Sequence, residues 1–191
     1  LITGAGGFIG RNLVAALHAD GKYDVMCYHH SQGESVLETM VKNADFVVHL
    51  AGVNRPGHGD EFAVGNAEFT HTLVNIMERA ENCAPVLYAS STQALLNNAY
   101  GHSKKEAEDI LCAHAAKMQS DVYIYRLTNV FGKWCRPHYN SVVATFCHNI
   151  SHGIPIRVDD SKHMMTLAYI DDIVEEFIRR IDKNKLGTAE V

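Results

Sequence analysis

Clusters of basic residues are missing from this sequence of 191 residues, which carries 17 Lys and Arg against 22 Asp and Glu and a formal net charge of −5. This balance gives no patch for nucleic acid or for an anionic membrane surface. Long apolar runs are missing too: no stretch approaches the roughly 20 residues of a transmembrane helix. We also see no secretory signal before the first expected strand. We therefore expect no nucleic-acid partner, no membrane partner and a cytoplasmic location.

Cysteine pairs and metal-binding motifs are also missing. The five cysteines are odd in number and contain no C-x-x-C pair, which indicates free thiols in a reducing compartment. Of the twelve histidines, only His148 and His152 have helical i, i+4 spacing, and they lack the glutamate of an H-E-x-x-H motif. We expect no metal site. His49, in an apolar run, is interpreted as a core histidine with a satisfied ring nitrogen.

What is present is a regular alternation of apolar strands and amphipathic helices over a chain that is 47% hydrophobic, without an internal repeat. After a first strand and helix, the patterns predict further strands at residues 23–28, 46–50, 86–89, 122–125 and 165–169. They predict helices at residues 36–43, 64–80, 100–118, 141–150 and 173–181. This alternation is typical of one doubly wound α/β domain with a parallel sheet.

A glycine-dense turn follows the first strand and precedes a helix. Gly4, Gly7 and Gly10 occupy this turn, and Leu13 and Leu17 then recur at helical spacing. Glycine lets a pyrophosphate approach the backbone, and the positive N-terminus of the next helix attracts the anion. The turn therefore predicts a dinucleotide site.

Hydroxyl side chains follow the apolar strand at residues 86–89. Ser90, Ser91 and Thr92 fall at its carboxyl end, which is where ligands bind in an open parallel sheet. Farther along, Tyr100 and Lys104 have i, i+4 spacing, so a helix would place the ammonium beside the phenol. A cation there favours the phenolate, and we expect Lys104 to lower the pKa of Tyr100.

Together these motifs resemble the extended short-chain dehydrogenase/reductase superfamily, in the branch that acts on nucleotide sugars. The resemblance covers nearly the whole chain and implies a Rossmann-type sheet with an incomplete C-terminal substrate lobe. It implies that Tyr100 is the general acid/base, that Ser91 holds the reacting oxygen, and that Lys104 tunes Tyr100 and reaches the nicotinamide ribose. The implied cofactor-binding residues, besides Tyr100 and Lys104, are Gly4, Gly7, Phe8, Ile9, Gly10, His30, Leu50, Ala51 and Gly52.

A narrower resemblance concerns residues 44–56 and 122–150, which are similar to bifunctional capsular-polysaccharide enzymes of the UDP-N-acetyl-L-fucosamine pathway. In those enzymes a reductase domain that uses NADPH on a 4-keto sugar nucleotide precedes a metal-binding cupin domain. The resemblance implies reduction of a 4-keto UDP-linked deoxy amino sugar. Thr92 and Gln93 replace the Asp-Glu pair of 4,6-dehydratases, which disfavours dehydration. An NAD-dependent 4-epimerase and a non-catalytic dinucleotide-binding scaffold remain alternatives.

The choice of cofactor rests on the end of the second strand. An NAD-preferring fold usually has an acid there for the ribose 2′-hydroxyl, whereas this strand ends in Tyr28, His29 and His30. This favours NADP(H) over NAD(H), with His30 and Arg11 near the 2′-phosphate. The resembling enzymes carry Arg in place of His30 and Lys in place of Gly6, so NAD(H) stays open.

Substrate contacts are expected on the C-terminal side. The resemblance assigns Asn129 and Thr92 to the sugar nucleotide. Arg136 suits bidentate contact with its diphosphate, and Lys133 is the alternative. We expect one domain over residues 1–191, with substrate-lobe elements from about residue 131. The chain starts inside a strand without Met, and it stops at Val191, beyond which the resembling enzymes place further substrate-lobe elements. We therefore interpret it as a fragment whose C-terminal lobe is incomplete. A homodimer and a cupin domain in the full-length protein are further expectations from the resemblance.

Overall fold

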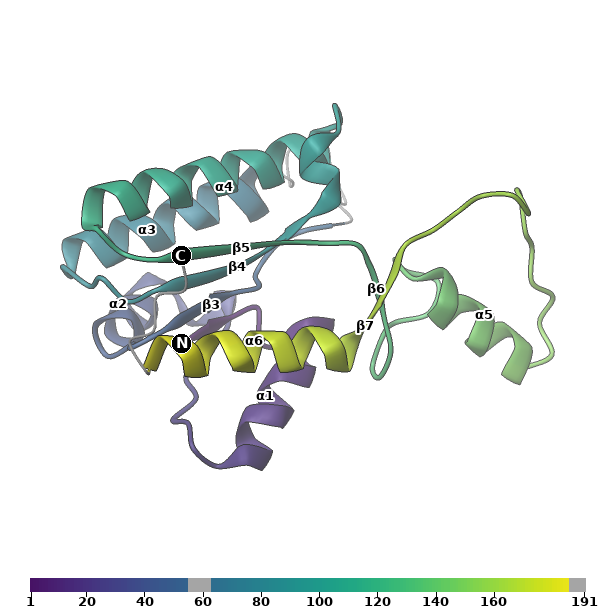
Figure 1. The fold of residues 1–191 in the computed structure, drawn as a ribbon, viewed down its shortest axis with the longest axis horizontal. Helices are drawn as coiled ribbons and strands as arrows, with labels where there is room; N and C mark the ends of the chain where they lie inside the picture. The colour runs from purple at the N-terminus through teal and green to yellow at the C-terminus, as the bar shows by residue number, and fades with distance from the viewer. Residues whose placement is uncertain (55–62, 186–191) are drawn as a thin grey trace.

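A five-stranded parallel sheet organises the chain in a computed structural model that describes residues 1–54 and 63–185. The strand order is β2-β1-β3-β4-β5 (Figure 1). The strands are β1 (Ile2–Thr3), β2 (Cys27–Tyr28), β3 (Val47–His49), β4 (Val86–Ser91) and β5 (Val122–Leu127). β2 lies on one side of β1, whereas β3, β4 and β5 follow one another on its other side. The order therefore reverses between β1 and β3.

Helices cover both faces of this sheet, as Figure 1 shows. One face carries α1 (Phe8–Asp20) and α6 (Ile170–Lys185), and the other carries α2 (Glu34–Lys42), α3 (Phe69–Arg79) and α4 (Ala99–Met118). A π-helical turn, η2 (Ala63–Glu68), leads into α3, and two 3₁₀ turns, η1 (His30–Gln32) and η3 (Thr92–Leu95), follow β2 and β4. The doubly wound α/β fold expected from the sequence is confirmed.

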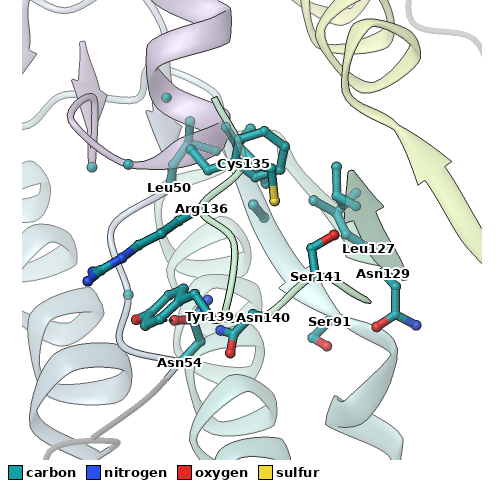
Figure 2. Close-up of a pocket in the computed structure, with 18 of the residues that line it drawn as sticks. Leu50, Asn54, Ser91, Leu127, Asn129, Cys135, Arg136, Tyr139, Asn140 and Ser141 are labelled. Carbon is teal, nitrogen blue, oxygen red and sulfur yellow. Dashed lines mark hydrogen bonds between the residues drawn. The ribbon is translucent and has the colours of Figure 1, made fainter. Parts of the chain in front are cut away.

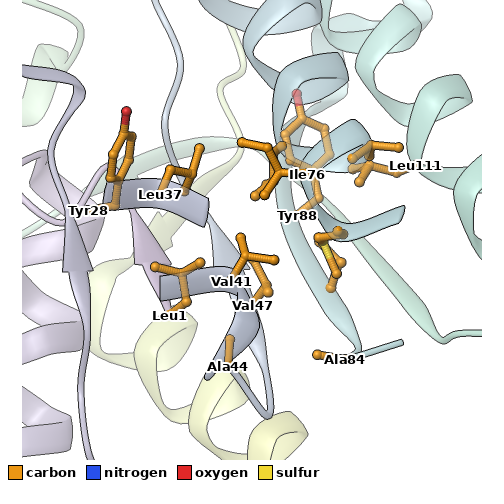
Figure 3. Packing of buried hydrophobic residues seen from close by; sticks show 14 of the residues in the cluster. Leu1, Tyr28, Leu37, Val41, Ala44, Val47, Ile76, Ala84, Tyr88 and Leu111 are labelled. Carbon is orange, nitrogen blue, oxygen red and sulfur yellow. The ribbon is translucent and has the colours of Figure 1, made fainter. Parts of the chain in front are cut away.

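Two apolar clusters form the core, one on each face of the sheet. In the first, Leu37 of α2, Ile76 of α3 and Leu111 of α4 are buried in one cluster with Val47 and Tyr88 (Figure 3). The second places buried side chains of α1 and α6 against the other face of β1, β3 and β4. Because both faces are covered, β3 reads as the near-continuous apolar run seen in the sequence.

A small second sheet lies beyond the end of β5. It pairs β6 (Asn129–Phe131) with β7 (Leu167–Tyr169), and α5 (Val142–Ser151) lies between them in the sequence. These elements project to one side of the main sheet in Figure 1, next to the carboxyl ends of its strands. They thus supply a second wall for anything that binds there.

Boundaries differ from the expected ones by a few residues. The second strand is only Cys27–Tyr28, the last helix begins at Ile170 rather than residue 173, and β6 was not expected. The segment 44–56 ends at Arg55 and Pro56, which lie outside the described residues. All five cysteines are free thiols, as expected. In the described ranges we find no helix of the length and apolar character that a membrane crossing requires.

Candidate active site

A cleft of about 1290 Å³ opens at the carboxyl ends of the parallel strands. Its floor is the point between β1 and β3 where the strand order reverses, the place where open α/β sheets bind ligands. The glycine turn and the segment after β3 form one side, and residues 127–145 form the opposite wall, part of which appears in Figure 2. The cleft therefore joins the glycine turn, the segment after β3, Ser91, the Tyr100/Lys104 pair and the segment that carries Asn129 and Arg136.

The glycine turn is shaped for close backbone contact. Gly4 has a φ of 72°, and a Cβ atom on it would lie 2.5 Å from the backbone nitrogen of Ala51. Helix α1 begins right after the turn, and its N-cap, Gly7, has no side chain to satisfy the first N–H groups. These amides and the helix dipole suit a pyrophosphate, so the residues present fit a dinucleotide cofactor.

Tyr100 and Ser91 meet across the cleft from two elements. Asn98 caps α4 by accepting a hydrogen bond from the Gly101 N–H at 2.7 Å, which fixes the first turn that carries Tyr100. Ser91 ends β4 and accepts a hydrogen bond from the Gln93 N–H at 3.2 Å. Burial raises the pKa of the Tyr100 phenol, while a hydrogen bond with Ser91 acts in the opposite direction. The phenol therefore keeps its proton at neutral pH.

Lys104 is almost fully buried, with 6% of its surface exposed. Its Nζ donates a hydrogen bond to the Ala89 carbonyl at 2.8 Å and lies 4.6 Å from the centre of the Tyr88 ring. Burial lowers the pKa of Lys104 to about 8, against the opposite effect of Glu108. The net shift of the Tyr100 pKa is upward, opposite to the lowering expected from Lys104, because burial is its largest cause.

A buried chain of hydrogen bonds joins Thr3, His49 and Thr70 next to Lys104. The hydroxyl of Thr3 lies 2.7 Å from Nδ1 of His49, and the hydroxyl of Thr70 lies 2.9 Å from its Nε2. Burial, assisted by the charge of Lys104, lowers the pKa of His49 to about 3, so its ring is neutral. The prediction that His49 is a core histidine with a satisfied ring nitrogen is confirmed, and both of its nitrogens have a hydroxyl partner.

Asn66 is a site residue that the sequence analysis missed. It is 1% exposed, accepts a hydrogen bond from the Val53 N–H at 2.9 Å and donates to the Ser103 hydroxyl at 2.9 Å. Ser103 in turn donates to the Tyr100 carbonyl at 2.8 Å. Asn66 thus links the segment after β3 to the first turn of α4. Its i, i+4 spacing to Thr70 was the available signal, since two polar residues there interrupt the apolar face of a predicted helix.

The opposite wall is a loop between β6 and α5. In Figure 2, Tyr139 lies beside Asn54, and its hydroxyl donates to Asn54 Oδ1 at 3.1 Å. Arg136 packs its guanidinium 5.4 Å from the Tyr139 ring centre, and Arg11 of α1 lies 5.0 Å from the Trp134 ring centre. Cationic side chains therefore line both the glycine-turn side of the cleft, with Arg11, and the opposite wall, with Arg136.

Most predicted site residues line this one cleft. They are Gly4, Gly7, Phe8, Ile9, Gly10, Leu50, Gly52, Ser91, Tyr100, Lys104, Asn129 and Arg136. Ala51, Thr92 and His30 are not part of its lining. The His30 ring packs edge-on against Phe69 at 6.2 Å. His29 instead stands at the glycine turn, with its Cε1 3.7 Å from where a Cβ of Gly6 would lie. In the described part of the chain, no three His, Cys, Asp or Glu side chains gather to hold a metal ion.

Comparisons with known proteins agree with this geometry. The UDP-2-acetamido-2,6-beta-L-arabino-hexul-4-ose reductase of Pseudomonas aeruginosa is 46% identical over 189 residues, which are 99% of this chain and 50% of that protein. The crystal structure of capsular polysaccharide assembling protein CapF from Staphylococcus aureus matches with a TM-score of 0.86 at 44% identity, over 100% of this chain and 50% of that one.

A UDP-glucuronic acid 4-epimerase from Bacillus cereus, solved in complex with NAD, shares the fold with a TM-score of 0.82 at 19% identity, over 95% of this chain and 73% of that one. The present chain spans about half the length of the Pseudomonas and Staphylococcus proteins. The sequence profile of the NAD dependent epimerase/dehydratase family matches residues 1–190. The chain therefore belongs to the NAD dependent epimerase/dehydratase family.

Proposed function

We propose that this chain uses NADPH to reduce the 4-keto group of a UDP-linked 2-acetamido-2,6-dideoxy sugar in the synthesis of a capsular or surface polysaccharide. The observation that carries the proposal is the meeting of Ser91, Tyr100 and Lys104 in one cleft with the glycine turn. The Pseudomonas reductase, 46% identical over nearly the whole chain, supports the substrate class.

The protonation state of the site suits reduction. A ketone gains a hydride at carbon and a proton at oxygen, and the nicotinamide, when bound, supplies the hydride. Tyr100 supplies the proton, because burial raises the pKa of its phenol and keeps it in the acid form. Ser91 donates a hydrogen bond to the same oxygen as negative charge develops there. Lys104, with a pKa of about 8, is mostly an ammonium at neutral pH and favours that charge.

The finer choice of NADP(H) over NAD(H) is part of the proposal. The end of β2 reads Tyr28, His29 and His30, where an NAD-preferring fold has a carboxylate for the ribose 2′-hydroxyl. In this proposal the glycine turn and the start of α1 hold the pyrophosphate, and His29, whose ring lies beside Gly6, contacts the 2′-phosphate. We assign this role to His29 rather than to His30, whose ring packs on Phe69.

On the sugar-nucleotide side we propose contacts from Asn129 and Arg136, both of which line the cleft. Arg136 offers a planar set of donors to the diphosphate. Thr92 stays a predicted substrate contact, although it lies outside the lining. A cupin domain in the full-length protein, a homodimer and a cytoplasmic location also stay predictions.

The test is Tyr100→Phe in the full-length protein, assayed for NADPH oxidation with a 4-keto UDP-sugar. We expect the variant to lose at least about 100-fold in kcat, the range of general acid catalysis, while it binds NADPH as tightly as wild type. Tyr123→Phe is the matched control, because its hydroxyl bonds to Asp121 and Asn184 away from the cleft. Equal inactivity of wild type and Tyr100→Phe, with NADPH bound by both, contradicts a reductase and leaves the scaffold.

The main alternative enzyme is a nucleotide-sugar 4-epimerase, because the resembling epimerases share the Ser, Tyr and Lys set. An epimerase returns its hydride to the sugar, so it interconverts two sugars without consuming NADPH. One NADPH oxidised for each sugar formed supports the reductase. Sugar interconversion with no net change in NADPH absorbance supports the epimerase instead.

A further inference from the structure

A buried carboxylate lies one helical turn beyond Lys104, outside the cleft lining. Glu108 of α4 is 2% exposed and accepts three hydrogen bonds. The Ser90 hydroxyl donates to its Oε1 at 2.6 Å, and Arg126 donates from Nε to Oε1 at 2.9 Å and from Nη2 to Oε2 at 2.6 Å. A carboxylate with this many partners keeps its charge although it is buried. We call Ser90, Glu108 and Arg126 the carboxylate clamp.

The carboxylate clamp joins the three elements that build the proton-donating side of the site. Ser90 belongs to β4 and Arg126 to β5, where they are paired neighbours in the sheet register, and Glu108 belongs to α4. On β4, Ser90 stands between Ala89, whose carbonyl holds Lys104, and Ser91. The carboxylate therefore ties the end of the strand that bears Ser91 to the helix that bears Tyr100 and Lys104.

The carboxylate clamp also fixes the charge near Lys104. Burial acts to raise the pKa of Glu108, but hydrogen bonds from Arg126 and Ser90 outweigh it and hold that pKa below its ordinary value. Two other titratable groups face Lys104 from the sheet, and both are neutral: the pKa of Tyr88 is raised by burial, and the pKa of His49 is lowered to about 3. Glu108 is thus the ionised partner that acts on the Lys104 ammonium.

We propose that the carboxylate clamp is a positioning device for the reaction: it holds Ser91 in place against Tyr100 and keeps a fixed negative charge one turn from Lys104. Glu108 and Arg126 act through their neighbours and do not touch the reacting atoms. This proposal rests on the reductase function proposed above. Its two effects, on geometry and on charge, predict two separate experimental signatures.

Two variants of the full-length protein separate these effects. Ser90→Ala removes the tie to β4 and leaves the Glu108–Arg126 pair intact, whereas Glu108→Gln removes the charge in a side chain of the same shape. Asp109→Asn is the matched control, because it removes one carboxylate from an exposed position of the same helix. For each protein, kcat and the KM for NADPH are measured, and the Lys104 amine is titrated by NMR in cofactor-free protein.

We expect Ser90→Ala to lose at least about tenfold in kcat with a KM for NADPH within about twofold of wild type, because small displacements at a reacting centre cost rate more than binding. We expect Glu108→Gln to move the Lys104 titration below the wild-type midpoint of about 8. Asp109→Asn should change neither. If Glu108→Gln does not fold, the double variant Glu108→Gln/Arg126→Met takes its place, because it removes both charges of the buried pair and leaves no unpaired guanidinium. The same lowering of the Lys104 pKa is expected, because Glu108 is the group that raises it.

The proposal is overturned if Ser90→Ala keeps the wild-type kcat, or if the Lys104 midpoint in Glu108→Gln, or in its replacement, matches that in Asp109→Asn. Wild-type protein without any NADPH oxidation would refute the reductase function separately. In that case the Lys104 titration still decides the electrostatic half of the proposal, because it needs no substrate.

Discussion

Replacing Lys104 by Met should make the cofactor-free protein more stable at neutral pH, although it removes a residue proposed for catalysis. The pKa of Lys104 falls from an ordinary value of 10.5 to about 8 because the ammonium is buried. That difference corresponds to a penalty of roughly 3.4 kcal/mol for the charged form, at about 1.36 kcal/mol for each pH unit. Met loses the hydrogen bond to Ala89 and the contact with the Tyr88 ring, worth roughly 1.5 kcal/mol together. A net gain of about 2 kcal/mol remains.

The pH dependence of stability is a second test of whether Lys104→Met is stabilising. Because the folded protein releases this proton at a lower pH than the unfolded chain, the penalty is complete below pH 8 and disappears as the pH rises to 10.5. Urea unfolding should therefore show Lys104→Met more stable than wild type at pH 7, and the gap should shrink or reverse at pH 10. Lys105→Met, a change at a half-exposed neighbour, should alter stability by less than about 0.5 kcal/mol. A less stable Lys104→Met protein at pH 7, or a gap that does not change with pH, refutes the reasoning.

Three further changes test the cofactor site and the packing of α4. His29→Ala should weaken binding of 2′,5′-ADP about tenfold, or roughly 1.4 kcal/mol, and leave 5′-AMP unchanged in calorimetric titrations, whereas His30→Ala should change neither. Gly101→Ala places a Cβ atom 2.2 Å from the Gln93 carbonyl oxygen. It should therefore lower the unfolding free energy by about 1 to 2 kcal/mol and reduce kcat, in spite of the better helix propensity of Ala. Tyr88→Phe removes a buried hydroxyl without a hydrogen-bond partner. It should raise the free energy of unfolding by up to about 1 kcal/mol, as measured by urea unfolding.

The arrangement of the main sheet could be predicted from sequence because its strands are short and mostly apolar, and each strand before β5 is followed by a helix. Val47 and Val48 are buried on both faces, which is why their run reads as a central parallel strand. The pairing of β6 with β7 could not be predicted in this way. Asn129 and Leu167 are paired neighbours, although 38 positions separate them in the sequence. Both residues are exposed, so the alternation of buried apolar and exposed polar residues that would indicate this pairing is missing.

Some residues of the candidate site could likewise be predicted from the sequence, and others could not. Ser91, Tyr100 and Lys104 could be found because their chemistry depends on residue type and on spacing along one strand end and one helix. Asn66 and Glu108 could not, because their roles depend on hydrogen bonds to residues of other elements, such as the Asn66 contact with Ser103. The sequence also favoured His30 for the 2′-phosphate. The turn after β2 sends that ring onto Phe69, which leaves His29 beside the glycine turn.

The i, i+4 spacing of Tyr100 and Lys104 predicts that the two side chains are neighbours, but it does not predict which physical effect dominates their titration. Burial disfavours the charged form of each group, so it raises the pKa of Tyr100 and lowers that of Lys104. These opposite shifts of the two pKa values both follow from the tight packing of α4 on β4, which the spacing of residues along a helix does not reveal. They leave a protonated phenol beside an ammonium that is mostly charged at neutral pH. A pair in that state can give a proton to a ketone oxygen, which is the step that the proposed reduction requires.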